Sequence, residues 1–168
     1  MVDMELIGVR VELPTNTPVL LLRELGGAHR VLPIYIDQVE ARAIQFGIDE
    51  VPTPRPLTHD LFVSTLEALG ARLQRLLITE LRESPTGGTF LAELEVATPT
   101  GVVRISSRPS DGVALAVRAG APIVADESVL ERAATPAIDE EDGADEEIVD
   151  QFREFLDDVN PEDFAAGE

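Results

Sequence analysis

The chain has 168 residues, no cysteine and a net charge of −19. This length allows one domain with an apolar core and is too short for two domains of ordinary size. Without cysteine, disulfides and zinc sites with thiolate ligands are excluded, and we expect a cytoplasmic protein. No apolar run approaches the length of a membrane-spanning helix, so we expect no membrane partner.

The beginning of the chain predicts three strands. Residues 5–13 alternate between apolar and polar side chains, as strands with one buried face do. Residues 19–25 are apolar enough to be buried on both faces. Two glycines then lead through a tight turn into a third strand at residues 30–36.

Two helices are predicted next, separated by a proline-rich loop at residues 49–56. The first helix spans residues 37–47, where apolar side chains recur at helical spacing. The second spans residues 58–69. We expect Thr58 to be its N-cap and Gly70 to be the residue that ends it.

The following part of the chain predicts further strands and two helices. We expect strands at residues 72–82, 89–97, 102–106 and 122–125. A helix over residues 109–119 begins at a proline, which suits the first helical turn, and a short helix follows at residues 127–132. Because most strands follow one another through short turns, the predicted class is α+β. Its sheet is mostly antiparallel or mixed, with about three inserted helices.

Acidic charge is concentrated at the end of the chain. Residues 1–134 carry 18 acidic and 12 basic side chains, whereas residues 135–168 carry 14 acidic and 1 basic. We predict a domain over residues 1–134, a disordered acidic linker over residues 135–147, and an acidic amphipathic C-terminal helical tail over residues 148–168. The helix docks on its own domain or a second subunit, or it occupies the groove of a protein partner, and the sequence leaves these alternatives open.

Polar side chains gather at the starts of two predicted helices, in residues 55–60 and 106–111. Backbone N–H groups at a helix start lack partners, so such a start either binds an anion or is capped by its own side chains. Both interpretations stay open here. The candidate functional residues are those of the two segments and one carboxylate near the start of an earlier helix: Arg55, Thr58, His59, Asp60, Arg108, Ser110, Asp111 and Glu40.

Five segments of the chain resemble the bifunctional nuclease family, a group of small bacterial and plant domains. They occur in family order within residues 1–132: LPIYIDQVEARAI, RPLTHDL, LEALGARLQRLLITEL, GTFLAEL and SSRPSDGVALAVRAGAPI. The resemblance implies a nuclease that hydrolyses phosphodiester bonds in DNA and RNA with low sequence specificity. It also implies a homo-oligomer, with a dimer favoured. The chain has Gly112 where alanine is commoner in the family.

The resemblance implies roles for the residues of the matching segments. The expected catalytic residues are His59, Asp60, Arg108 and Asp111, and the expected phosphate-binding residues are Arg55, Thr58 and Ser110. Carboxylate oxygens are the ligands that hard cations prefer. The expected ligands of a Mg²⁺ or Mn²⁺ ion are Glu40, Asp60 and Asp111. No nucleotide or organic cofactor is expected.

The alternative is a non-enzymatic regulatory or protein-interaction module. In that interpretation Asp60 and Asp111 only stabilise helix starts, and Arg108 pairs with one of them to brace the two helices together. His59 is then a structural histidine. The polar cluster binds a small anion or braces a subunit interface. The acidic charge of the chain favours this alternative, because basic groups that neutralise phosphates normally drive nucleic-acid binding.

Overall fold

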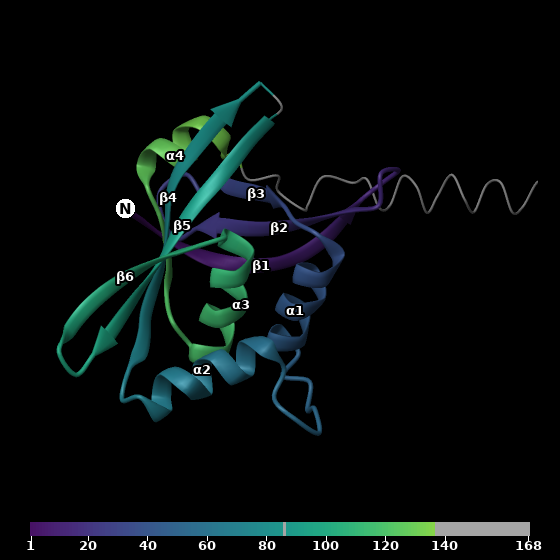
Figure 1. Cartoon of the computed structure of the whole chain (residues 1–168). Helices are drawn as coiled ribbons and strands as arrows, with labels where there is room; N and C mark the ends of the chain where they lie inside the picture. The colour runs from purple at the N-terminus through teal and green to yellow at the C-terminus, as the bar shows by residue number, and fades with distance from the viewer. Residues whose placement is uncertain (86, 137–168) are drawn as a thin grey trace, which may run out of the picture. The chain divides into compact units, whose positions relative to one another are not determined.

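The computed structural model describes residues 1–85 and 87–136, which form an α+β fold around one seven-stranded mixed sheet (Figure 1). This confirms the predicted fold class. In chain order the elements are β1 (Val2–Glu12), β2 (Thr17–Glu24), β3 (Val31–Tyr35), α1 (Gln38–Ile48), α2 (Thr58–Ala68), β4 (Arg72–Ser84), β5 (Gly87–Thr98), β6 (Gly101–Ser107), α3 (Pro109–Ala119), β7 (Ile123–Ala125) and α4 (Glu127–Ala133). Within this part of the chain, no helix is long and apolar enough to span a membrane.

The strands lie in the order β3-β2-β1-β7-β4-β5-β6. The short strand β7 is antiparallel to β1 and parallel to β4. The other neighbouring strands pair in an antiparallel manner, as the short turns predicted. β7 therefore joins two antiparallel halves of the sheet, β3-β2-β1 and β4-β5-β6, into one.

The core lies between the sheet and the helices. Leu20 and Leu22 of β2 and Leu76 and Ile78 of β4 are fully buried. The face of β2 that carries these leucines is buried as predicted. On its other face Val19 is buried, Leu21 is half-buried and Arg23 is exposed, so burial on both faces holds only for the beginning of the strand. Figure 1 shows α1, α2 and α3 gathered together and α4 apart from them. α3 contributes Val113 to the core, so the helix that carries the second polar segment is firmly positioned.

Gly112 allows α3 to lie directly against β4. A Cβ atom at this position would lie 2.3 Å from Cδ1 of Leu76, far inside van der Waals contact. Leu76 is fully buried, so its side chain would have to shift within the packed core to admit an added methyl group. The glycine that stands here in place of the family's commoner alanine is therefore matched to Leu76, and it fixes the depth at which α3 is seated.

The start of α2 differs from the prediction. Leu57, rather than Thr58, is the N-cap residue, and Thr58 is already helical. The backbone N–H of Leu57 donates a hydrogen bond of 2.8 Å to Oδ2 of Asp60, so a carboxylate three residues ahead satisfies the N-cap amide. Gly70 follows the end of α2 with a φ of +69°, which confirms its predicted role.

A buried ion pair joins the connection between β2 and β3 to α4. Arg30 donates from Nε to Glu24 at 2.9 Å and from Nη2 to the other Glu24 oxygen at 3.0 Å. Nη2 also lies 2.9 Å from Glu127 of α4. Glu24 is one of two buried polar residues in the described part of the chain, so Arg30 neutralises a charge that water reaches poorly.

Thr135, which the sequence assigns to the linker, forms an isolated antiparallel bridge with Val31 at the start of β3. The ordered domain thus continues beyond the predicted boundary at residue 134. The rest of the predicted linker, beyond residue 136, and the predicted helical tail over residues 148–168 lie outside the described residues.

Candidate active site

The start of α3 carries the central residue of the candidate site. β6 ends at Ser107, Arg108 has an extended backbone as the N-cap residue, and Pro109 begins the helix. The sequence folds this way because proline has a φ suited to the first turn and needs no hydrogen-bond acceptor there. Pro109 is buried, whereas the Arg108 side chain is 61% exposed. The strand–helix junction therefore presents a guanidinium at the surface.

Arg108 binds two carboxylates from two helices. Its Nε and Nη2 atoms donate to the two oxygens of Asp111, at 2.7 and 2.9 Å, in a bidentate pair. Its Nη1 atom lies 2.8 Å from Oε1 of Glu40 in α1. The prediction that Arg108 pairs with Asp60 or Asp111 is confirmed for Asp111. The Glu40 contact joins α1 to the start of α3.

His59 brings α2 to the same cluster. Its Nε2 atom lies 3.6 Å from Oδ1 of Asp111, and its side chain is largely buried. That distance is an ion-pair contact when the imidazole is protonated. The structure therefore unites four of the predicted residues, which we call the Arg108 cluster: Glu40, His59, Arg108 and Asp111.

Asp60 faces a different partner. Its Oδ1 atom accepts a hydrogen bond of 2.5 Å from Nε of Arg118, near the end of α3, while Oδ2 accepts the N–H of Leu57. Arg118 also donates from Nη1 to the carbonyl of Ala114 at 2.8 Å. The Arg118 side chain is only 10% exposed. Asp60 thus fastens α2 to α3 and caps α2.

The electrostatic environment keeps both aspartates ionised. Partial burial is the largest single influence on Asp111 and opposes its ionisation, but the hydrogen bonds and charges of Arg108 and His59 together outweigh it, so the pKa of Asp111 lies below its usual value. Asp60 is similar: desolvation is outweighed by Arg118 and the Leu57 amide, and its pKa is lowered. Hydrogen bonds to Asp111 and then Glu40 raise the pKa of Arg108. Arg108 therefore remains a cation across the physiological range.

Glu40 has one oxygen that is not accounted for. Oε1 receives Arg108, whereas the buried Oε2 atom has no hydrogen-bond partner among the described residues. Buried carboxylate oxygens normally accept hydrogen bonds, because removal from water without compensation is costly. The Arg108 cluster therefore retains unused acceptor capacity beside its cation.

The remaining predicted residues lie near the cluster in sequence but do not bond to it. Ser110 is buried at the start of α3. Thr58 occupies the first turn of α2, and Arg55 lies in the loop before it. Within residues 1–85 and 87–136, no hydrogen bond or ion pair connects the Arg55 or Thr58 side chain to Arg108. Their phosphate-binding roles stay predictions.

The predicted metal ligands are arranged around arginines. Glu40 and Asp111 both hold Arg108, and Asp60 holds Arg118. The described residues contain no group of three or more His, Asp or Glu side chains placed to hold a metal ion. In this arrangement the Arg108 guanidinium fills the space between Glu40 and Asp111, so these residues do not fit a cation until Arg108 moves away. Dependence on Mg²⁺ or Mn²⁺ stays a prediction.

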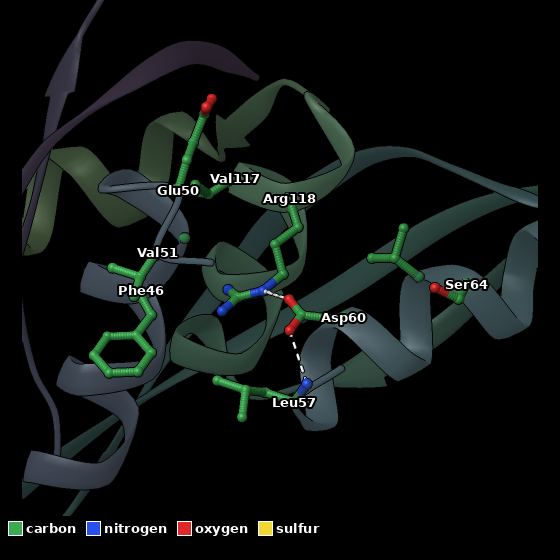
Figure 2. Close-up of a pocket in the computed structure, with 10 residues that line it drawn as sticks. Phe46, Glu50, Val51, Leu57, Asp60, Ser64, Val117 and Arg118 are labelled. Carbon is green, nitrogen blue, oxygen red and sulfur yellow. Dashed lines mark hydrogen bonds and ion pairs between the residues drawn. The ribbon is translucent and has the colours of Figure 1, made fainter. Parts of the chain in front are cut away.

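Arg118 is a residue that the sequence interpretation missed. It lies seven residues after Asp111 in α3, a spacing that places both side chains on one helix face. This spacing is the signal that could have identified Arg118. The neighbouring residues His59 and Asp60 of α2 contact Asp111 and Arg118 on that face. In Figure 2 the Arg118 side chain reaches Asp60, and both residues line a pocket.

The fold and cluster define an α+β domain in which three helices present arginine–carboxylate pairs beside a histidine. A family model described as the bifunctional nuclease domain matches residues 20–137. The chain belongs to this family, which confirms the resemblance found in the sequence.

Two relatives come from Mycobacterium tuberculosis, strains CDC 1551 / Oshkosh and ATCC 25618 / H37Rv. Each is described as an uncharacterized protein. Each is 45% identical to this chain over 169 residues, which covers 98% of both sequences. The similarity thus extends over nearly the full length of the chain.

Proposed function

We propose that the protein is a nuclease that hydrolyses phosphodiester bonds in DNA and RNA with low sequence specificity. The family match supports the class of activity. The observation that carries the proposal is the exposed Arg108 guanidinium, held in a fixed orientation by two carboxylates beside a histidine. A fixed cation beside a proton acceptor is an arrangement that phosphodiester hydrolysis uses.

Arg108 is the proposed phosphate-binding residue. A guanidinium has five N–H donors, and the contacts to Glu40 and Asp111 use three of them. Because the side chain is mostly exposed, the remaining donors are available to a phosphate oxygen. The two carboxylates set the orientation of the guanidinium before substrate arrives, so little reorganisation is needed when negative charge develops on the phosphate.

His59 is the proposed general base. Its Nε2 atom faces Asp111, which favours the tautomer with a proton on Nε2 and leaves Nδ1 to accept a proton from water. The water oxygen then bonds to phosphorus and the bond from phosphorus to the leaving oxygen breaks. Asp111 stabilises the imidazolium that forms, and the imidazolium returns its proton to the leaving oxygen or to solvent.

A metal ion remains part of the proposal through the family resemblance. If Mg²⁺ or Mn²⁺ binds, it supplies Lewis-acid stabilisation of the phosphate oxygens. In this proposal Arg108 contacts the phosphate and His59 transfers the proton, with or without the ion. The assay below therefore measures cleavage with each ion and with EDTA.

The test is cleavage of labelled single- and double-stranded DNA and RNA by highly purified protein, with Mg²⁺, Mn²⁺ or EDTA. His59→Asn should abolish cleavage, and Asp111→Asn should do the same while both variants stay folded. The matched control is His29→Asn, since His29 lies in a turn with a φ of +52°, a conformation that asparagine tolerates. Equal cleavage by wild type and His59→Asn would assign the activity to a contaminant or to another site.

The alternative, a non-enzymatic module, has one specific observation in its favour. Arg108 joins α1 to α3 through Glu40 and Asp111, which is the geometry of a structural brace. In that case purified wild type cleaves none of the substrates. Asp111→Asn then lowers the melting temperature and leaves no activity to lose.

The proposal includes a homodimer that forms through β6. This edge strand exposes Val102, Val103 and Ile105, although Val103 and Ile105 pair with buried residues of β5. Apolar side chains on an unpaired strand edge favour association with a second copy. Ile105→Lys should convert the dimer to a monomer in sedimentation velocity, whereas Val39→Lys, at an exposed position of α1, should not. A protein partner for the tail and a cytoplasmic location also stay predictions.

A further inference from the structure

A pocket of about 410 Å³ lies between the end of α1, the start of α2 and the end of α3 (Figure 2), and Asp60, which follows His59 in the chain, is one of its lining residues. Its volume falls within the range of small-molecule sites. The residues that line it are Phe46, Gly47, Glu50, Val51, Leu57, Asp60, Val63, Ser64, Val117 and Arg118. None of the roles proposed for the Arg108 cluster uses this pocket.

Arg118 supplies a hydrogen-bond donor to the pocket. Nε is used by Asp60 and Nη1 by the Ala114 carbonyl, whereas Nη2 makes no hydrogen bond to the described residues. Figure 2 shows the guanidinium extending from Asp60 toward the side of the pocket where Phe46 and Leu57 lie. Since Nη2 has no acceptor among the described residues, it can donate to a ligand that occupies the pocket.

Asp60 and Ser64 add hydrogen-bonding capacity to the lining of the pocket. Each Asp60 oxygen already accepts one hydrogen bond and has a further lone pair for a ligand donor. The Ser64 hydroxyl is both donor and acceptor. The pocket thus offers both hydrogen-bond donors and hydrogen-bond acceptors. A ligand that also carries both kinds of group along one edge is complementary to it.

Charge excludes an anion as the best ligand. The positive charge of Arg118 is compensated by Asp60 at 2.5 Å, and Glu50 adds a negative charge to the lining. An anionic group entering the pocket would gain no net attraction and would lose its hydration. A neutral group with a polar edge avoids both penalties.

The walls favour a flat apolar surface. Phe46, Val51 and Leu57 lie together on one side of Arg118 in Figure 2, and Val63 and Val117 complete the apolar lining. A nucleobase combines a neutral ring, whose faces bury well against apolar and aromatic side chains, with an edge that carries donors and acceptors. The pocket has both kinds of complementary group.

We infer that this pocket binds one nucleobase of a single-stranded nucleic acid, next to the phosphodiester held at Arg108. Asp60 and His59 are consecutive residues of α2, so the base pocket and the proposed general base adjoin one another. Because Asp60 and Arg118 together offer an acceptor and a donor, each of the bases finds a partner, which agrees with low sequence specificity. This inference rests on the proposed nuclease function for the choice of ligand.

The test is binding of a short phosphorothioate-linked single strand that contains 2-aminopurine, measured by fluorescence in EDTA with the full chain. The chain has no tryptophan and one tyrosine, so the probe signal is free of protein emission. Burial against Phe46 should quench the probe. Ser64→Phe, which fills the pocket from exposed α2, should weaken binding at least tenfold. Ala68→Phe, which adds the same ring on α2 outside the pocket, should bind the strand with the same affinity as the wild type.

Competition identifies the group that is bound. A strand with a normal base at the probe position should displace the probe, and a strand with an abasic site there should not. Equal affinity in Ser64→Phe and Ala68→Phe, equal displacement by the abasic strand, or no quenching by wild type would each overturn the base pocket. Cleavage is measured separately. Cleavage without base binding overturns this inference alone, whereas base binding without cleavage supports the pocket and counts against the nuclease.

Discussion

Two arginines of this domain each bind two carboxylates, and their surroundings differ. Arg30 is 23% exposed and binds Glu24, which is buried, together with Glu127. Arg108 is 61% exposed and binds Asp111 and Glu40. At Arg30 the arginine neutralises a carboxylate that the fold has buried. At Arg108 the carboxylates position an arginine that the fold leaves at the surface.

The comparison separates a structural ion pair from a candidate functional one within a single chain. Two neighbours of Arg108 reinforce the distinction: His59 contacts Asp111, and Glu40 keeps a buried oxygen without a partner. An ion pair that only stabilises a fold is expected to satisfy its buried members. Exposure of the cation and unused capacity in its partners are therefore the features that point to a ligand.

Replacement of the two arginines gives the largest expected effect. Arg108→Gln should lower the cleavage rate by about 100-fold or more, because loss of a preorganised charge at the phosphate has effects of that size. Arg30→Gln should leave the cleavage rate unchanged and lower the melting temperature, because Glu24 is then buried without its cation. The measurements are single-turnover cleavage and thermal melts of both variants. Loss of cleavage in folded Arg30→Gln would contradict the assignment of a purely structural role to Arg30 and a functional role to Arg108.

Replacement of one carboxylate in each cluster should give a smaller effect. Glu40→Gln keeps an acceptor for Arg108 but removes the charge that orients it, so cleavage should fall about tenfold, roughly the contribution of one charge-assisted hydrogen bond. Glu127→Gln is the matched change at Arg30 and should leave cleavage at the wild-type rate. If both variants cleave like the wild type, the orientation of Arg108 by Glu40 is irrelevant to the reaction.

The smallest expected effect concerns the Asp60–Arg118 pair, which resembles Arg30 in the burial of its cation. The lowered pKa of Asp60 means that its contribution to stability is present above the unfolded pKa of about 3.9 and is lost as the pH falls through the folded value. Asp60→Asn should therefore lower the free energy of unfolding by about 1 kcal/mol near neutral pH, a figure reduced by solvent screening. The deficit should shrink on acidification.

The control for that titration is Asp37→Asn, whose side chain makes no capping hydrogen bond at the start of α1. Urea unfolding of the three proteins between neutral and acidic pH provides the comparison. A deficit in Asp60→Asn that stays constant with pH would show that packing, not charge, links α2 to α3.

The sequence predicted local features well. The Arg108–Asp111 pair is three residues apart across a helix start, and the boundaries of α3 follow from Pro109 and Gly120. Patterns of this kind depend on neighbours in the chain, which a single sequence contains. The succession of strands and helices along the chain was predictable for the same reason.

Contacts between distant residues were not predictable. Asp60 and Arg118 are 58 residues apart, and their pairing depends on how α2 crosses α3. Glu40 reaches Arg108 only because α1 packs beside α3. No period or spacing in the sequence records these crossings. The metal-ligand prediction grouped Glu40, Asp60 and Asp111 because they are carboxylates in the segments that resemble the family, whereas the fold gives each of them an arginine partner.

The place of β7 in the sheet has a consequence for the order of folding. β1 and β4 are not neighbours, and only the three residues Ile123–Ala125 connect their ladders. The hairpin of β1 and β2 and the hairpin of β4 and β5 each form from contacts close in sequence, which is fast. The two halves become one sheet only when a segment near residue 125 inserts between them. During synthesis, the edges of β1 and β4 that pair with β7 therefore stay unpaired until almost the whole domain has been made.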